Sequence, residues 1–150
     1  MKRVAVVAVL FLGACSSSQN AVVNPPPEID VIQVYGPADI PYSRGQDSVL
    51  GEYAFRIENK ADVPITLRRI ELSSLAGGTI ALRREDRAFN RTVNPGSAEV
   101  VSVNARVYFR TTSSGSPTNE PLTIRAVLYF DSPKGTFRRI ITRNIGQFPA

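Results

Sequence analysis

The stretch VSVNARVYFR, residues 101–110, alternates apolar and polar side chains along most of its length. The stretch LTIRAVLYF, residues 122–130, repeats that pattern. Alternation with a period of two places successive side chains on opposite faces of a β-strand. One face of each strand is then apolar and the other polar or mixed, as in antiparallel sheets with one solvated side. These two stretches therefore predict a protein built from antiparallel sheets.

The same pattern continues on either side of these stretches, and Gly, Pro and Asn separate one run from the next. No amphipathic helix is apparent. We expect strands near residues 29–35, 49–58, 64–73, 79–84, 88–93, 98–110, 121–130 and 136–145. This spacing predicts an all-β fold, an immunoglobulin-like antiparallel β-sandwich of seven to eight strands, over residues 29–150. The Cys pair and the core Trp of antibody domains are absent, so the prediction concerns architecture only.

Two of the expected strands contain an Arg-Arg pair at which the apolar phase shifts by one residue. These pairs are Arg68-Arg69 and Arg138-Arg139. A β-bulge produces such a shift because it inserts one extra residue into a strand. We therefore predict a bulge at each pair. Bulges and inward-directed charge also protect edge strands from wrong pairing, which would explain both pairs without any ligand.

Residues 53–72, YAFRIENKADVPITLRRIEL, resemble half of a sandwich that occurs in several families. An alternating strand ends in Asn, a short polar loop follows, and Pro opens the next strand. The segment is similar to the start of the water-stress (WHy) domains of late-embryogenesis-abundant proteins and to bacterial surface immunoglobulin-like modules. Asn94-Pro95-Gly96-Ser97, before a Val-rich strand, matches a turn that those domains also use. The resemblance covers about thirty residues and implies a fold, not a binding site.

The chain begins with MKRVAVVAVLFLGAC, residues 1–15. Lys2 and Arg3 precede an apolar run that is too short to span a bilayer, which needs about 20 residues, but fits a secretory signal. Leu12-Gly13-Ala14-Cys15 resembles the lipobox of bacterial lipoproteins. The resemblance implies lipid transfer to the Cys15 thiol and cleavage before Cys15, so that residues 1–14 are the signal peptide. The alternative is an ordinary signal peptide with an incidental Cys.

Residues 15–28 read as the lipidated Cys followed by a Pro- and Ser-rich tether, in which we expect no fold. Pro25-Pro26-Pro27 favours an extended spacer and is less suited to the alternative of a docking motif. Ser16 after the Cys resembles the sorting preference for the outer membrane known in enteric bacteria. That likeness implies a lipid anchor (a palmitate-type acyl group) at the periplasmic face of the cell outer membrane, or at the outer face of the plasma membrane in a Gram-positive cell.

The composition excludes several kinds of site. The chain has no His and one Cys, so it can build neither a Cys/His zinc site nor a catalytic set that needs His. We expect no enzyme activity, no metal and no cofactor, and we find no motif for nucleic acid. A hydrolase working through carboxylates alone is the least favoured function.

Charge is divided unevenly along the chain. Residues 15–67 hold three basic and seven acidic side chains, a net charge of −4, and residues 68–150 hold thirteen and six, a net charge of +7. The candidate ligand-binding residues are Arg on polar strand faces: Arg106 with Arg110 on one strand, and Arg125 with Arg138 or Arg139, which could share a sheet if their strands pair in immunoglobulin order. Arg suits phosphate and carboxylate recognition. A solvated Arg-rich surface without a ligand is the alternative.

Two functions are consistent with these observations. We favour a non-enzymatic, lipid-anchored envelope protein that acts as an adaptor or accessory subunit and binds a protein partner. The second is a binding module for anionic glycans or lipid head groups through the Arg-rich face, whose binding would weaken steeply with salt.

Overall fold

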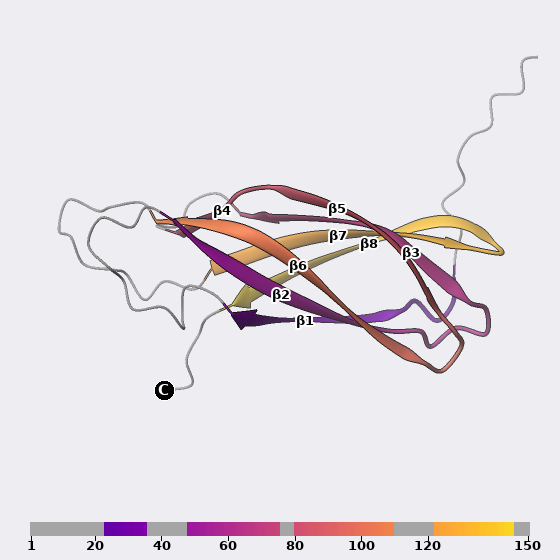
Figure 1. Cartoon of the computed structure of the whole chain (residues 1–150). Helices are drawn as coiled ribbons and strands as arrows, with labels where there is room; N and C mark the ends of the chain where they lie inside the picture. The colour runs from indigo at the N-terminus through magenta and orange to yellow at the C-terminus, as the bar shows by residue number, and fades with distance from the viewer. Residues whose placement is uncertain (1–22, 36–47, 76–79, 110–121, 146–150) are drawn as a thin grey trace, which may run out of the picture.

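A computed structural model describes residues 23–35, 48–75, 80–109 and 122–145 (Figure 1). These residues form eight β-strands: β1 (Glu28–Tyr35), β2 (Ser48–Glu58), β3 (Ile65–Ser74), β4 (Ile80–Leu82), β5 (Glu85–Val93), β6 (Ala98–Phe109), β7 (Leu122–Ser132) and β8 (Gly135–Ile145). Within these ranges no residue is helical, so none belongs to a helix able to cross a bilayer.

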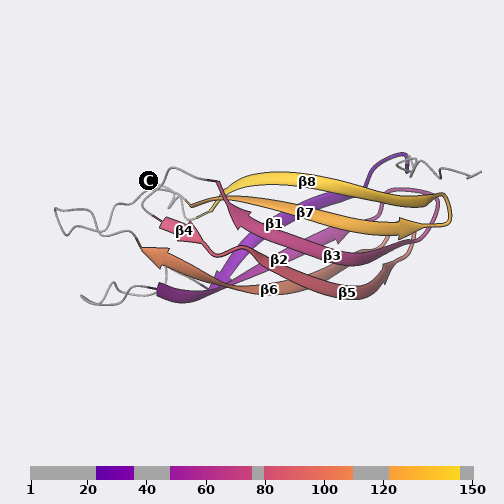
Figure 2. The same ribbon diagram turned by 90° about the horizontal axis from the view of Figure 1, so that it is seen from above.

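The strands form two four-stranded sheets. We call β1-β2-β6-β4 the first sheet and β5-β3-β7-β8 the second sheet. Every pairing is antiparallel, and the two sheets lie face to face as layers of one sandwich (Figures 1 and 2). The orders β1-β2-β6 and β3-β7-β8 correspond to strands A-B-E and C-F-G of the immunoglobulin fold. The predicted immunoglobulin-like sandwich is thus confirmed.

The fourth and fifth expected strands have a more specific arrangement than their sequence indicates. β4 pairs with β6 in the first sheet, whereas β5 pairs with β3 in the second. The chain therefore crosses from one sheet to the other at Arg83 and Arg84, which separate the two strands.

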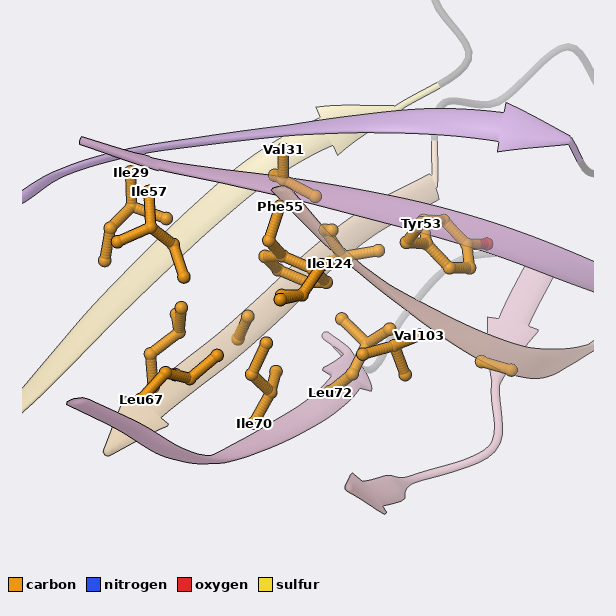
Figure 3. Close-up of a cluster of buried hydrophobic side chains, with 14 of the residues drawn as sticks. Ile29, Val31, Tyr53, Phe55, Ile57, Leu67, Ile70, Leu72, Val103 and Ile124 are labelled. Carbon is orange, nitrogen blue, oxygen red and sulfur yellow. The ribbon is translucent and has the colours of Figure 1, made fainter. Parts of the chain in front are cut away.

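The core lies between the sheets and follows the alternation of the sequence (Figure 3). Tyr53, Phe55 and Ile57 of β2 point into it and are fully buried. Leu67, Ile70 and Leu72 of β3 meet them from the second sheet (Figure 3). Burial of this apolar surface is the main term that stabilises the sandwich.

One of the two predicted bulges is present. The register of β3 against β7 shifts between Leu67 and Arg69, so Arg68 is the extra residue. The bulge keeps Leu67 and Ile70 both in the core although an even number of residues separates them. Its effect is to place Arg68 and Arg69 side by side on the outer face of the second sheet.

The prediction of a bulge at Arg138-Arg139 is wrong. β8 pairs with β7 in one unbroken register from Gly135 to Ile145. Phe137 and Ile141 keep the same phase, and Ile140 points outward with 48% of its surface exposed. The sequence suggested a shift in the apolar pattern because Ile140, an apolar residue on an edge strand, faces solvent.

Folded structure begins earlier than expected. Val23 belongs to the buried core cluster, and Pro27 is buried as well. The predicted unstructured tether over residues 15–28 is therefore too long at its C-terminal end. The signal peptide and Cys15 lie outside the described residues.

Candidate functional site

The predicted arginines are divided between the two sheets. Arg125 lies on β7, and Arg138 and Arg139 lie on β8, so these three share the second sheet as expected. Arg106 lies on β6 in the first sheet, where it donates a hydrogen bond to Ser48 Oγ at 3.2 Å. A single face containing Arg106 and Arg125 is therefore not formed, because β6 and β7 belong to different layers. Arg110 lies outside the described residues.

The structure adds one arginine to the group on β8. Arg143 follows Arg139 by four positions and is exposed. We call Arg125, Arg138, Arg139 and Arg143 the arginine edge, because β8 is a terminal strand of the second sheet. β8 carries three of them and no acidic residue. Arg143 was not among the residues predicted from the sequence, although its spacing from Arg139 places both on one side of a regular strand.

The side chains of the arginine edge point to both sides of the sheet. Arg138 pairs in register with Tyr129, whose side chain lies on the outer face. Arg139 and Arg143 pair with the buried residues Leu128 and Ile124, so they point to the inner side of the sheet, at the flank where β8 approaches β1. The Nε atom of Arg139 is buried and has no hydrogen-bond partner among the described residues.

The arginine edge differs from other arginines in its lack of carboxylate partners. Over the described ranges, none of its four guanidinium groups forms an ion pair or hydrogen bond. Arg56, by contrast, pairs with Glu58 at 2.9 Å, and Arg84 pairs with Glu71 at 3.0 Å. Guanidinium groups without a protein partner are available to an external anion.

A second cluster of charges surrounds the β3 bulge and is internally compensated. Arg68 donates to Asp131 Oδ2 and to Asn90 Oδ1, each at 2.6 Å, and so links three strands. Arg69 lies over the ring of Tyr129, 4.1 Å from its centroid, and contacts Glu71 at 3.0 Å. We call these residues the bulge network. Its guanidinium groups already have carboxylate partners.

An open groove of about 650 Å³ follows the bulge network. Its lining includes Arg68, Arg69, Tyr129, Thr136 and Arg138. Arg138 is the one arginine in this lining without a carboxylate partner among the residues that the structure describes. The groove thus joins the bulge network to the arginine edge, and Arg138 is the residue that they share.

The two sheets carry opposite net charge. The strands of the first sheet hold five acidic side chains and two arginines, a net charge of −3, and those of the second hold four acidic side chains and eight arginines, a net charge of +4. The division between the halves of the sequence thus becomes a division between layers, because β1 and β2 belong to the first sheet and β7 and β8 to the second.

The outer face of the first sheet exposes large apolar side chains. Their exposed fractions are 59% for Ile32, 52% for Val34, 52% for Leu50, 61% for Val100 and 38% for Tyr108. We call these five residues the apolar face. They come from β1, β2 and β6, which are adjacent in the sheet. Charged side chains lie beside them, with Arg56 opposite Val100 and Arg106 opposite Leu50, so the apolar face is a mixed surface of the composition that protein interfaces have.

Among the described residues, pKa values depart from their ordinary range at two places, the Tyr53 phenol and the Glu28–Lys60 pair, in which Glu28 also raises the pKa of Lys60. Burial raises the pKa of the Tyr53 phenol, whose hydroxyl has no hydrogen-bond partner among the described residues. The Lys60 ammonium, hydrogen-bonded to Glu28, lowers the pKa of that exposed carboxyl. None of these groups lies in the arginine edge. Within the described ranges, no three His, Cys, Asp or Glu side chains group together as metal ligands would.

Comparisons with known proteins identify the fold alone. No protein-family model and no curated protein matches this chain. The chain is similar to the X-ray structure of the structural genomics target SoR45, with 13% identity, a TM-score of 0.56, and coverage of 87% of this chain and 95% of that one. It is also similar to the crystal structure of the putative ApaA protein from Bordetella pertussis, with 10% identity, a TM-score of 0.48, and coverage of 87% and 98%. The likeness to SoR45 supports the sandwich fold of this chain.

Proposed function

We propose that this protein is a non-enzymatic, lipid-anchored component of a bacterial envelope, an adaptor that holds a partner protein at the membrane surface. The anchor would be Cys15, and its location the periplasmic face of the outer membrane. Glu28, the first residue of β1, follows Cys15 by thirteen positions, and Val23 already packs on the core. The sandwich would therefore stay close to the bilayer, since an extended chain spans at most about 3.5 Å per residue.

The observation that supports a protein partner is the apolar face. Ile32 of β1 lies in register with Ala54 of β2. Val100 of β6 lies in register with Arg56, which is also on β2. Ala54 points outward yet is only 6% exposed, because its small side chain lies below its larger neighbours. A partner covering this face would remove aliphatic surface from water, at about 25 cal/mol for each Å² buried. Aliphatic and Tyr side chains with arginine beside them are common in protein interfaces.

A pull-down from solubilised native envelopes tests the adaptor role. The wild-type protein is expected to recover a stoichiometric protein partner, and the double variant Ile32→Ser/Val100→Ser is expected to lose it. Leu75→Ser is the control, because Leu75 is also apolar and 46% exposed but follows β3 of the second sheet, away from the apolar face. Recovery of no partner by wild type, or equal loss in both variants, would count against the apolar face.

A separate experiment tests the anchor. Palmitate should label the wild-type protein in cells and should not label Cys15→Ser. The variant should leave the membrane fraction, because one lipid-bearing residue is expected to hold the domain there. An unlabelled wild-type protein that retains residues 1–14 would overturn the proposed location without affecting the sandwich.

A further inference from the structure

Over the part of the chain that the structure describes, the sandwich has four edge strands, and β8 differs from the other three. Edge strands expose unpaired backbone N–H and C=O groups, which proteins protect by shortness, by bulges or by charge. β4 has only three residues, and the registers of β1 and β5 are shifted against their neighbours. β8 is neither short nor irregular, because its eleven residues pair with β7 in one register, and its protection against pairing rests on charge alone. It lies outermost on one side of the molecule (Figure 2).

β8 also differs from β5, the other edge of the same sheet, in charge. β5 contains Glu85 and Asp86 together with Arg87 and Arg91, so its charges cancel. β8 contains only arginines, and no carboxylate of the described residues pairs with them. Protection of an edge needs charge, but it does not need charge of a single sign. A strand that paired with β8 would therefore need acidic side chains opposite these arginines.

The spacing of the arginines matches the geometry of an added strand. Arg139, Ile141 and Arg143 lie on one side of the sheet, and Arg138 and Ile140 lie on the other. A strand paired with β8 would place a residue opposite each of these five positions. Two acidic residues four positions apart, with an apolar residue midway, would face Arg139, Arg143 and Ile141. Such residues are about 13 Å apart along a strand.

We propose that β8 is a strand-addition site for an extended acidic segment of a partner protein. Backbone hydrogen bonds to the free edge of β8 would supply affinity, and carboxylates paired with Arg139 and Arg143 would supply specificity. A flat anionic surface such as a bilayer meets one side of a sheet, whereas an added strand reaches the arginines on both sides. This site lies on the second sheet, so it does not depend on the apolar face.

A designed peptide tests the proposal with the full-length chain in detergent. The peptide has eleven residues, the length of β8, and alternates Thr with Val except for a centre that reads Glu-Thr-Val-Thr-Glu. A control peptide carries Gln in place of both Glu residues. We expect the acidic peptide to bind and to slow amide hydrogen exchange in β8. We expect binding about tenfold weaker for the Gln peptide, from two lost ion pairs of ordinary strength.

Protein variants provide the reciprocal test. Arg139→Gln/Arg143→Gln should weaken binding of the acidic peptide by about tenfold, and Arg139→Lys/Arg143→Lys should restore part of it. Arg87→Gln/Arg91→Gln is the matched control, since it removes the same charge from the opposite edge of the same sheet and should leave binding unchanged. Circular dichroism establishes that each variant is folded.

Three outcomes would overturn the strand-addition site: equal binding of the Glu and Gln peptides, unchanged exchange in β8, or equal losses in the β8 and β5 variants. A fourth is binding of phosphatidylglycerol vesicles or an anionic glycan that requires Arg139 and Arg143 while the acidic peptide fails to bind. That result would assign the arginine edge to an anionic surface. The adaptor role is tested separately by the Ile32 and Val100 variants, so the two proposals can fail independently.

Discussion

Replacement of Asn59 by Ala should destabilise this sandwich more than its position in a loop suggests. Asn59 follows β2 directly and is fully buried. Its Nδ2 donates to the carbonyl oxygens of Val63 and Val93, at 2.8 and 3.0 Å. Its Oδ1 accepts the backbone N–H of Ala61 at 3.0 Å. One amide thereby links the β2–β3 loop to the end of β5.

The cost follows from the groups that the Ala side chain would leave behind. Two carbonyl oxygens and one N–H would lose their side-chain partner in a site without solvent access. Each such loss costs about 1–3 kcal/mol, and partial relaxation favours the lower end, which gives about 4 kcal/mol in total. The backbone bonds of Asn59 to Ser97 and Gly96 would remain, because Ala has the same backbone groups.

Urea unfolding measures this cost. With a slope of about 2 kcal/mol/M, the midpoint of Asn59→Ala should fall by about 2 M. Asn94→Ala is the control: Asn94 is exposed in the adjacent turn and uses its backbone oxygen to accept from Ser97, so its midpoint should change little. A loss of less than about 1 kcal/mol for Asn59→Ala would refute the reasoning, because the three bonds would then be replaceable by water or by local movement.

Other variants test individual side chains. Tyr53→Phe should raise the free energy of unfolding by about 1 kcal/mol, since it removes a buried hydroxyl without a partner among the described residues. Burial raises the pKa of Tyr53, so the folded state keeps the phenol protonated. In the unfolded chain Tyr53 ionises near pH 10, so the free energy of unfolding of the wild type should fall as the pH rises above about that value. Tyr53→Phe has no such phenol and should lose less stability at alkaline pH; identical profiles would contradict this. Arg68→Ala should cost less than about 1 kcal/mol, and high salt should reduce the cost, because the Arg68–Asp131 pair is about half exposed. Arg139→Met should raise the melting temperature, since Nε is buried with no partner among the described residues, and it should abolish the contribution of Arg139 to acidic-peptide binding; a lower melting temperature would show that the guanidinium stabilises the fold.

The sequence predicted strands well because alternation is a local property. Val101, Val103, Ala105 and Val107 point inward as their spacing indicated, and all four are buried. The bulge at Arg68 was predictable for the same reason, since apolar residues on both sides of the pair fix the phase of each half of β3. At Arg138-Arg139 the bulge was predicted on the assumption that Ile140 is buried. Ile140 lies on an edge strand and is exposed, so the strand needs no bulge there.

Sheet membership was harder to predict than strand position. Whether Arg106 and Arg125 share a face depends on which strands pair, and that is decided by contacts between residues distant in the sequence. The chain gave no local signal for the crossing at Arg83 and Arg84, so β4 and β5 could not be assigned to different sheets. The buried role of Asn59 was likewise not evident, because polarity alone indicates an exposed loop residue.

The arginine edge and the apolar face have a common physical character: neither is explained by the stability of the sandwich. Arg139 Nε is buried with no partner among the described residues, and such a donor loses its hydration on folding without gaining a hydrogen bond. The side chains of Ile32 and Val100 gain little on folding, since more than half of the surface of each stays in contact with water. Residues that break the local rules of folding tend to be those that function uses. On this argument, variants at Arg139 and Val100 should separate stability from binding, whereas variants at Asn59 should change both.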